Sequence, residues 1–230
     1  MLLSQANQIL DQNPHSFEDG FKRLENGHGF IAARTEMPRC SGKMIEWWFS
    51  YIHTTEEYKQ WHPGDHIFSD WKGPRKTGAY IGGTHLIHER LGTSTIHKLR
   101  LNFREPSTIL DTSRFNAAGV SAAIYGRGGP LYLPLWSAHV LHLVHDTADG
   151  CVMRSRFWLG DVAPAVPLLA GAIRRDMTQD ASLAGLHKHC REEMTILASF
   201  LPALYRKEAT AQSAKPMSSP TRSRAQEQFD

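Results

Sequence analysis

Between residues 187 and 205 the apolar positions recur every three or four residues, which predicts an amphipathic helix. At about 100° per residue, one stripe about 80° wide holds most of them. Its members are Leu186, Cys190, Met194, Leu197, Leu201 and Leu204. Glu193 falls inside this apolar stripe, and His189 lies at its edge one turn earlier. Because a buried carboxylate is costly unless something neutralises it, an ion pair or a bound metal ion is the usual solution. The alternative is that Glu193 and His189 form a hydrogen-bonded pair at the edge of the core.

Upstream of this helix, several segments have the composition and alternation of β-strands. Residues 95–105 alternate cleanly, with His97 on the apolar face, either as a hydrogen-bonded core histidine or as the lining of a cavity. In residues 151–159, Arg154 and Arg156 alternate with apolar neighbours and are expected on the outer face of the sheet. Further strands are expected at 43–53, 79–92, 107–112, 117–125 and 131–145. The sequence DTADG predicts a hairpin turn between the strands at 131–145 and 151–159.

A series of strands followed by one long C-terminal helix predicts an α+β fold in which an antiparallel sheet wraps the helix. This arrangement is a helix-grip, and it encloses a cavity between sheet and helix. Residues 1–40 predict an N-terminal segment with a short helix and turns, and residues 41–206 the helix-grip domain. Within that domain, residues 54–76 predict a helical turn followed by a Pro-Gly turn. Residues 207–230 are too poor in apolar side chains to order themselves and are expected to be a disordered tail.

Bulk composition narrows the class of protein further. The chain has 230 residues with 41% apolar content, enough for one substantial core. The net charge of +3 is small and the basic residues are dispersed, so no nucleic-acid partner is expected. No apolar run approaches the roughly 18 residues of a membrane span, and the N-terminus lacks a secretory pattern. Three scattered cysteines without a CxxC motif favour a reducing, cytoplasmic setting.

Histidine is the residue type that stands out, because 11 of the 13 histidines lie between His53 and His189. His189 and Glu193 at i and i+4 project from one helix face about 5–6 Å apart, which suits two ligands of one cation. The remaining ligands would come from the sheet side, and the residues alone leave the choice among them open. These candidates are His62, Asp65, His66, His85, His88 and Glu89. A mixed shell of nitrogen and oxygen favours zinc over iron or manganese, whereas calcium and magnesium prefer oxygen alone.

Four motifs in this order resemble the diacetylphloroglucinol hydrolase family, which includes phloretin hydrolase. They are EWWFSY, WHPGDHIFSDW, GCVMRSRFWLG and HCREEMTILASFLPALY, and the resemblance covers residues 40–205. The resemblance implies a Bet v 1-like helix-grip domain that holds one zinc ion and hydrolyses the carbon-carbon bond between an acyl group and a phenolic ring. It also implies the metal ligands, which are His66, Glu89, His189 and Glu193.

The same resemblance implies residues that contact the substrate. Tyr58, eight residues before His66, would hold a phenol hydroxyl, and His142 would be an active-site histidine, with His139 as the alternative. Tyr58 and His142 would then act as general acid and base on the ring. Ser69 stands where the family has Asn, and Phe157 where it has Tyr. Both changes indicate a related but different substrate.

Three classes of function remain open at this point. The first is the zinc hydrolase, with a small aromatic substrate, no nucleic-acid or membrane partner, and a homodimer as one assembly. The second is a helix-grip binding protein that carries an aromatic or polyketide ligand without turnover, which the residues at Ser69 and Phe157 favour. The third is a mononuclear iron oxygenase, which the histidine-rich shell suggests.

Overall fold

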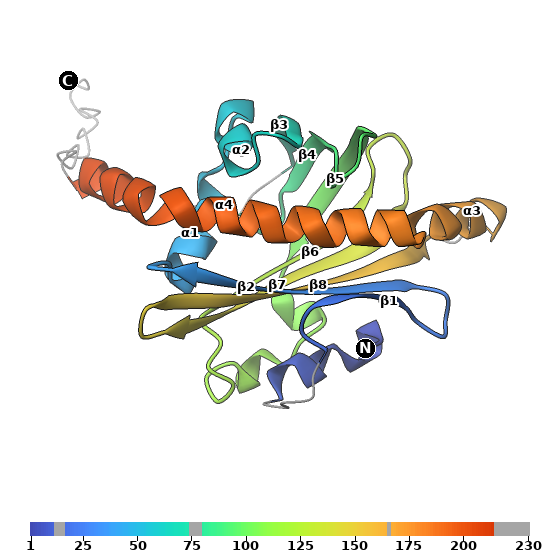
Figure 1. The fold of residues 1–230 in the computed structure, drawn as a ribbon, viewed down its shortest axis with the longest axis horizontal. Helices are drawn as coiled ribbons and strands as arrows, with labels where there is room; N and C mark the ends of the chain where they lie inside the picture. Colours follow the sequence, from blue (N-terminus) through green and yellow to red (C-terminus); the bar gives the residue numbers. More distant parts are fainter. Residues whose placement is uncertain (12–16, 74–79, 165–166, 214–230) are drawn as a thin grey trace, which may run out of the picture.

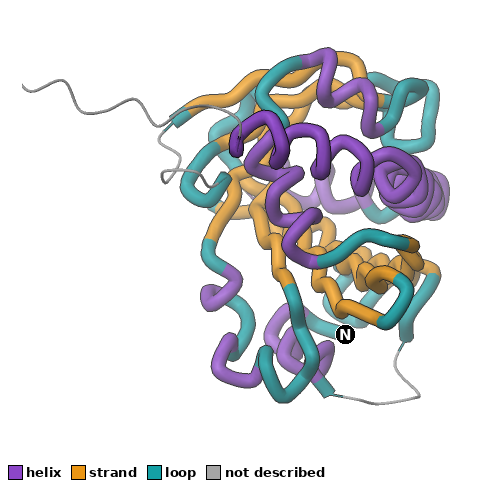
Figure 2. The backbone as a smooth tube through the Cα atoms, turned by 90° about the vertical axis from the view of Figure 1, so that its left-hand side faces the viewer, coloured by secondary structure: helices purple, strands orange, loops and turns teal. Residues whose placement is uncertain are grey.

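The computed structural model describes residues 1–11, 17–73, 80–164 and 167–213. One antiparallel sheet of eight strands curves around the long helix α4 (Asp180–Ser213) (Figure 1). Turned by 90°, Figure 2 shows the longer helices on one side of this sheet and the N-terminus with short helical turns on the other. The α+β helix-grip arrangement expected from the sequence is therefore confirmed.

The strands follow one another around the sheet with a single long crossing. Their bounds are β1 Gly20–Arg23, β2 Gly29–Pro38, β3 His66–Lys72, β4 Thr84–Glu89, β5 His97–Arg104, β6 Ala122–Pro130, β7 Trp136–Thr147 and β8 Gly150–Ala163. The order in the sheet is β1-β2-β8-β7-β6-β5-β4-β3. The chain leaves β2 and re-enters the sheet at the opposite edge with β3, and helices α1 and α2 make this crossing.

The helices are short except for α4. Their bounds are η1 Leu3–Leu10, α1 Gly42–Tyr51, α2 Thr55–Trp61, η2 Pro106–Thr108, η3 Thr112–Arg114 and α3 Pro167–Met177. Among the described residues, no helix has the length and apolar character needed to cross a membrane. The three cysteines are buried and free.

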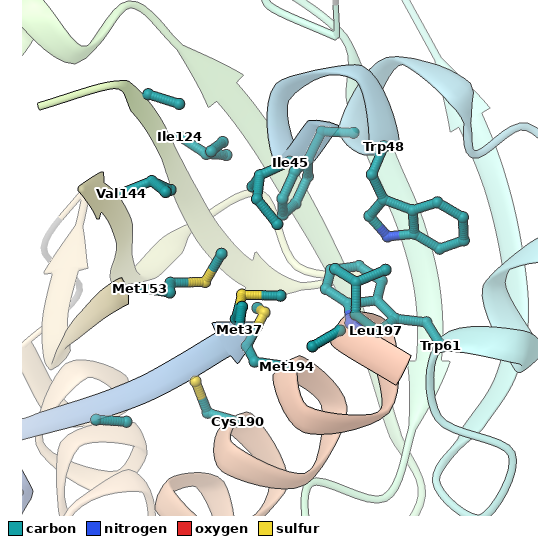
Figure 3. Packing of buried hydrophobic residues seen from close by; sticks show 14 of the residues in the cluster. Met37, Ile45, Trp48, Trp61, Ile124, Val144, Met153, Cys190, Met194 and Leu197 are labelled. Carbon is teal, nitrogen blue, oxygen red and sulfur yellow. The ribbon is translucent and has the colours of Figure 1, made fainter. Parts of the chain in front are cut away.

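The predicted stripe of α4 faces the sheet. Cys190, Met194, Leu197 and Leu201 have no exposed surface, and Figure 3 shows three of them against Met37 and Met153. Leu186 and Leu204 pack at the margin of this core. Each fully buried aliphatic side chain contributes about 1.5–3 kcal/mol of transfer free energy. The stripe therefore fixes the rotation of α4, and with it the inward direction of Glu193.

Pro202 interrupts the hydrogen bonds of α4, because proline has no N–H to donate to the carbonyl of Ala198. The Sγ atom of Cys40 lies 3.9 Å from that carbonyl oxygen and donates to it. A buried thiol thus satisfies the acceptor that the proline leaves free, and the helix continues to Ser213.

A second core covers the outer face of the sheet. Leu141, Leu143 and Trp158 point away from α4 and pack against η1. Arg154 and Arg156 share this outer face, as predicted, and both pair with Glu18, at 2.6 and 2.9 Å. Because η1 and the segment after β5 cover this face, the inner face against α4 is the one that holds the cavity.

Two of the predicted strands are wrong. Residues 43–53, expected as a strand, form helix α1, which the Ser41 side chain caps by accepting from the N–H of Met44. Aromatic residues favour strands, but Ile45, Trp48 and Phe49 recur at helical spacing and bury one face. Residues 107–112 contain parts of two 3-10 turns instead of a strand.

Other differences concern the ends of the chain. The turn-rich segment expected within residues 1–40 holds β1 and β2, and β2 pairs with β8 along ten residue pairs. Residues 54–76, expected to form a helical turn and a Pro-Gly turn, also contain the strand β3. The tail expected to be disordered continues α4 as far as Ser213, because helix propagation is favourable once a packed helix exists. Residues 214–230 lie outside the described part.

Core packing of α4 can be tested with a pair of neighbouring substitutions. Leu197→Ala removes a fully buried side chain and should lower the free energy of unfolding by about 2–5 kcal/mol in urea titrations. Ile196→Ala, at a half-buried position on the same turn, should cost about 1 kcal/mol or less. Equal losses in the two variants would contradict the assigned rotation of the helix.

Candidate metal centre and active site

Two distant parts of the chain supply the predicted ligands. His66 begins β3 and Glu89 ends β4, and the register of this pair places the two residues directly opposite each other. His189 and Glu193 occupy successive turns of α4, and their side chains approach His66 and Glu89. All four side chains are buried, Glu193 with 8% of its surface exposed. The structure thus brings together all four ligands that the resemblance implies.

The distances within this cluster fit a coordination shell better than hydrogen bonds. The Nε2 atom of His66 lies 3.7 Å from an oxygen of Glu89 and 3.7 Å from an oxygen of Glu193. The Nε2 atom of His189 lies 3.9 and 3.8 Å from the same two oxygens. Hydrogen bonds between nitrogen and oxygen are about 2.7–3.2 Å long. Zinc bonds of about 2.0–2.2 Å in a tetrahedron separate the ligands by about 3.3–3.6 Å, only a few tenths less than these pairs.

The second nitrogen of each imidazole fixes its tautomer. The Nδ1 atom of His66 lies 2.8 Å from the carbonyl oxygen of Tyr58, which can only accept, so Nδ1 carries the proton. Its Nε2 atom is buried and has no hydrogen-bond partner among the described residues. The Nδ1 atom of His189 donates to Asp65 at 2.9 Å, and Asp65 also accepts from the N–H of Gly92 at 2.8 Å. Histidines that bind metals are typically oriented in this way.

Tyr58 closes the cluster from the side of α2. Its hydroxyl donates to Glu89 at 2.5 Å, and its ring stacks on His66 with 3.8 Å between centroids. Burial, and then the carboxylate of Glu89, hold the pKa of Tyr58 well above its ordinary value. Tyr58 therefore remains a neutral hydrogen-bond donor at any working pH.

The electrostatics of the cluster show a shortage of positive charge. Burial raises the pKa of Glu193 to about 8 and lowers the pKa of His66 to about 2. Burial also acts to lower the pKa of His189, but Glu193, Glu89 and Asp65 together raise it. A divalent cation would favour the ionised carboxylates and the neutral imidazole of His66, which are the forms that bind metals. The residues present therefore fit a bound metal ion.

The other predicted ligand candidates have different roles. The Nδ1 atom of His62 accepts from the N–H of Asp65 at 3.1 Å, and its ring stacks on His189 at 4.9 Å. His62, Asp65 and His189 are close enough to hold an ion. However, the Nε2 atom of His189 lies beside Glu89 and Glu193, and Asp65 accepts from the Nδ1 atom of His189 and the N–H of Gly92, so we assign Asp65 and His62 a supporting role. His85 shares the inner face with Glu89 and bonds Ser69, while His88 lies on the other face against Phe68.

The direction of strand β7 separates the two active-site histidine candidates. His142 points to the inner face, where Ser155 bonds its Nδ1 atom at 2.8 Å and Phe157 lies 5.9 Å from its ring. Burial lowers the pKa of His142 to about 4, so the ring is neutral near pH 7. His139 points to the outer face and pairs with Asp161 at 2.7 Å. Only His142 shares the face that holds the metal cluster.

A cavity of about 410 Å³ adjoins the cluster on the inner face of the sheet. Its volume lies within the range of about 300–1,000 Å³ that is common for ligand sites. Glu89 and Phe157 are among its lining residues, whereas Ser69, which bonds His85 at 2.6 Å, is not. Most of the remaining wall is aliphatic, from Leu99, Leu101, Val140, Leu159, Met177 and Leu186. The cavity predicted between sheet and helix is therefore present.

A curved sheet that grips a helix and holds two histidines and two glutamates beside an apolar cavity defines a helix-grip protein with a candidate metal centre. The family described as "DAPG hydrolase PhiG domain" matches residues 1–206, and the chain belongs to this family. The predicted resemblance is thus confirmed.

Curated relatives agree with this assignment. The chain is 25% identical over 233 residues to 2,4-diacetylphloroglucinol hydrolase from Pseudomonas protegens, which covers 90% of this chain and 74% of that protein. It is 28% identical over 202 residues to phloretin hydrolase from Eubacterium ramulus, with 82% and 72% covered. Among solved structures, a norcoclaurine synthase from Thalictrum flavum matches at 16% identity and a TM-score of 0.41, covering 75% of this chain and 96% of that one.

We expect the buried carboxylate on α4 to dominate metal affinity. Glu193→Gln keeps the shape of the side chain but removes its charge, and should weaken zinc binding by about 100-fold or more in competition with a chromophoric chelator. Glu46→Gln, on the exposed face of α1, is the matched control and should bind zinc like the wild type. Wild-type affinity in the Glu193 variant would remove this residue from the ligand set.

The raised pKa of Glu193 also predicts a pH dependence of the metal-free protein. Between the ordinary value of 4.5 and about 8, the unfolded chain has lost this proton and the folded protein retains it. Because the folded state then binds more protons, its stability falls as pH rises through this window. In urea unfolding with chelator present, Glu193→Gln should gain stability relative to the wild type between pH 5 and about pH 8. A difference that is independent of pH would contradict the burial of this charge.

Proposed function

We propose that the protein is a zinc-dependent hydrolase that cleaves the carbon-carbon bond between an acyl group and a phenolic ring and releases a carboxylic acid. The observation that carries the proposal is that the Nε2 atoms of two buried histidines each lie 3.7–3.9 Å from oxygens of both buried glutamates, beside a cavity that could hold an aromatic ketone. Membership of the hydrolase family supports the same activity.

The proposed ligands of the zinc ion are His66, Glu89, His189 and Glu193. A bound zinc ion supplies a Lewis acid that polarises a carbonyl and lowers the pKa of water to about 7. Two neutral imidazoles with two carboxylates suit zinc better than calcium or magnesium, which prefer oxygen ligands only. Asp65 and the carbonyl of Tyr58 hold the two imidazoles in their ligating orientation.

Cleavage of an acyl-aryl bond is difficult because the electron pair of the bond remains on the ring carbon, which must then receive a proton. His142 is neutral near pH 7 and lies on the inner face of the sheet, so we propose that it accepts a phenol proton and passes it to the ring carbon. Water supplies the hydroxyl of the released acid and the proton that restores the phenol. Tyr58 keeps its proton and orients Glu89 as a hydrogen-bond donor. Tyr58 and His142 are the proposed catalytic pair.

Ser69 and Phe157 point to a substrate that differs from those of the relatives. The Ser69 hydroxyl is occupied by His85, and Phe157 presents an apolar ring to the cavity. Neither residue offers a free donor to a ring hydroxyl. We therefore propose a substrate with an apolar group, instead of a hydroxyl, against Phe157.

A binding protein without turnover is the second candidate, and the largely aliphatic wall of the cavity favours it. Such a protein would sequester an aromatic or polyketide ligand. Turnover separates the two functions directly.

An iron oxygenase is the third class of function. Its reaction would require oxygen, whereas hydrolysis proceeds without oxygen.

The activity is tested by incubating the zinc-loaded protein, without oxygen, with a panel of acylated phenols and measuring free carboxylic acid by chromatography. The proposal predicts stoichiometric release of acid and phenol from at least one member, and no release with Glu193→Gln. Binding of these compounds with no release by the wild type would establish the binding protein instead.

Tyr58 and His142 are tested by substitutions that preserve volume. Tyr58→Phe and His142→Gln should each lower kcat by about 10²–10⁴-fold, the range expected for a positioned proton donor or acceptor. Tyr132→Phe removes the same hydroxyl from a side chain that is 74% exposed, and should leave kcat unchanged. Wild-type kcat in both site variants would refute their role.

A further inference from the structure

Among the described residues that line the 410 Å³ cavity, His97 is the only histidine. It begins β5, and its ring points to the inner face together with Leu99 and Leu101. Of the two alternatives that the sequence leaves open, the structure supports the cavity lining. Within the described part of the chain, no hydrogen bond engages its imidazole.

The register of the sheet places His97 directly opposite Glu89. Residues in such a pair have Cβ atoms about 4.5–5.5 Å apart on the same face. Glu89 belongs to the metal cluster and also lines the cavity, so the reacting carbonyl of a substrate would lie at this end. His97 therefore borders the cavity next to the point of reaction.

The two residues proposed as catalytic are not among the described residues that line this cavity. The hydroxyl of Tyr58 donates to Glu89, and the Nδ1 atom of His142 bonds Ser155. Ser69 is committed to His85. Next to Glu89 in the cavity, the imidazole of His97 is the free polar group that a substrate hydroxyl would meet.

We propose that His97 is a specificity-determining residue that hydrogen-bonds the ring hydroxyl ortho to the acyl group of the substrate. This assignment rests on the proposed function for the identity of the ligand. The ortho hydroxyl is the ring substituent closest to the acyl carbonyl. When the carbonyl lies beside Glu89, this hydroxyl lies within reach of His97, which is opposite Glu89 in the β4-β5 pair. A buried hydroxyl without a partner would lose binding free energy, so the contact selects for it.

Two ligands without an acyl carbon test the contact independently of catalysis. 4-Hexylresorcinol and 4-hexylphenol differ only in the hydroxyl ortho to the alkyl chain. Calorimetric titration of the zinc-loaded wild type should give a Kd for the resorcinol at least about tenfold lower than for the phenol. His97→Leu should abolish this ratio by weakening the resorcinol, and His97→Asn should restore part of it. His88→Leu, on the opposite face of the neighbouring strand, should retain the wild-type ratio.

The outcomes separate this inference from the proposed function. A ratio that persists in His97→Leu, or is absent from the wild type, overturns the role of His97. Loss of affinity for both ligands alike in His97→Leu also overturns it, because that result indicates a packing role. Selective binding without hydrolysis of any 2-hydroxyaryl ketone overturns the hydrolase proposal but supports the contact at His97.

Discussion

Two carboxylates buried beside two imidazoles form the constraint on which the rest of the site depends. Glu89 and Glu193 come from the sheet and from the helix, and each lies 3.7–3.9 Å from both histidine nitrogens. Such a cluster has a high cost in a protein interior unless a cation balances it. The raised pKa of Glu193 is the expression of that cost in the metal-free protein. A divalent ion would remove the cost and join α4 to the edge of the sheet.

Core packing, strand register and one hydrogen bond position this cluster in the fold. The apolar stripe of α4 sets the rotation of the helix, the β3-β4 register sets His66 opposite Glu89, and Asp65 orients His189. The same sheet curvature leaves a cavity on the inner face, lined mainly by aliphatic side chains. The metal cluster lies at one end of that cavity, so binding and reaction are joined through Glu89.

Some of this could be predicted from the sequence because the signals are periodic. The stripe of α4 and the misplaced Glu193 follow from helical spacing, and β5 follows from clean alternation. The strand predicted at residues 43–53 was wrong because aromatic residues favour strands, whereas tertiary packing makes this segment the helix α1. The strand β2 was missed because its pairing partner, β8, lies more than a hundred residues away. The choice between His139 and His142 depends on strand parity, which the sequence pattern did not resolve. Asp65 was one of several possible ligands, and its role as the partner of His189 needed the folded turn.

The central claim is that one ion joins these four side chains, and anomalous diffraction at the zinc edge from crystals of the zinc-loaded protein tests it most directly. The account predicts one strong peak about 2.0–2.2 Å from Nε2 of His66 and His189 and from an oxygen of Glu89 and Glu193. A peak elsewhere, or a Glu193 side chain turned to solvent with no peak in the cluster, would contradict it.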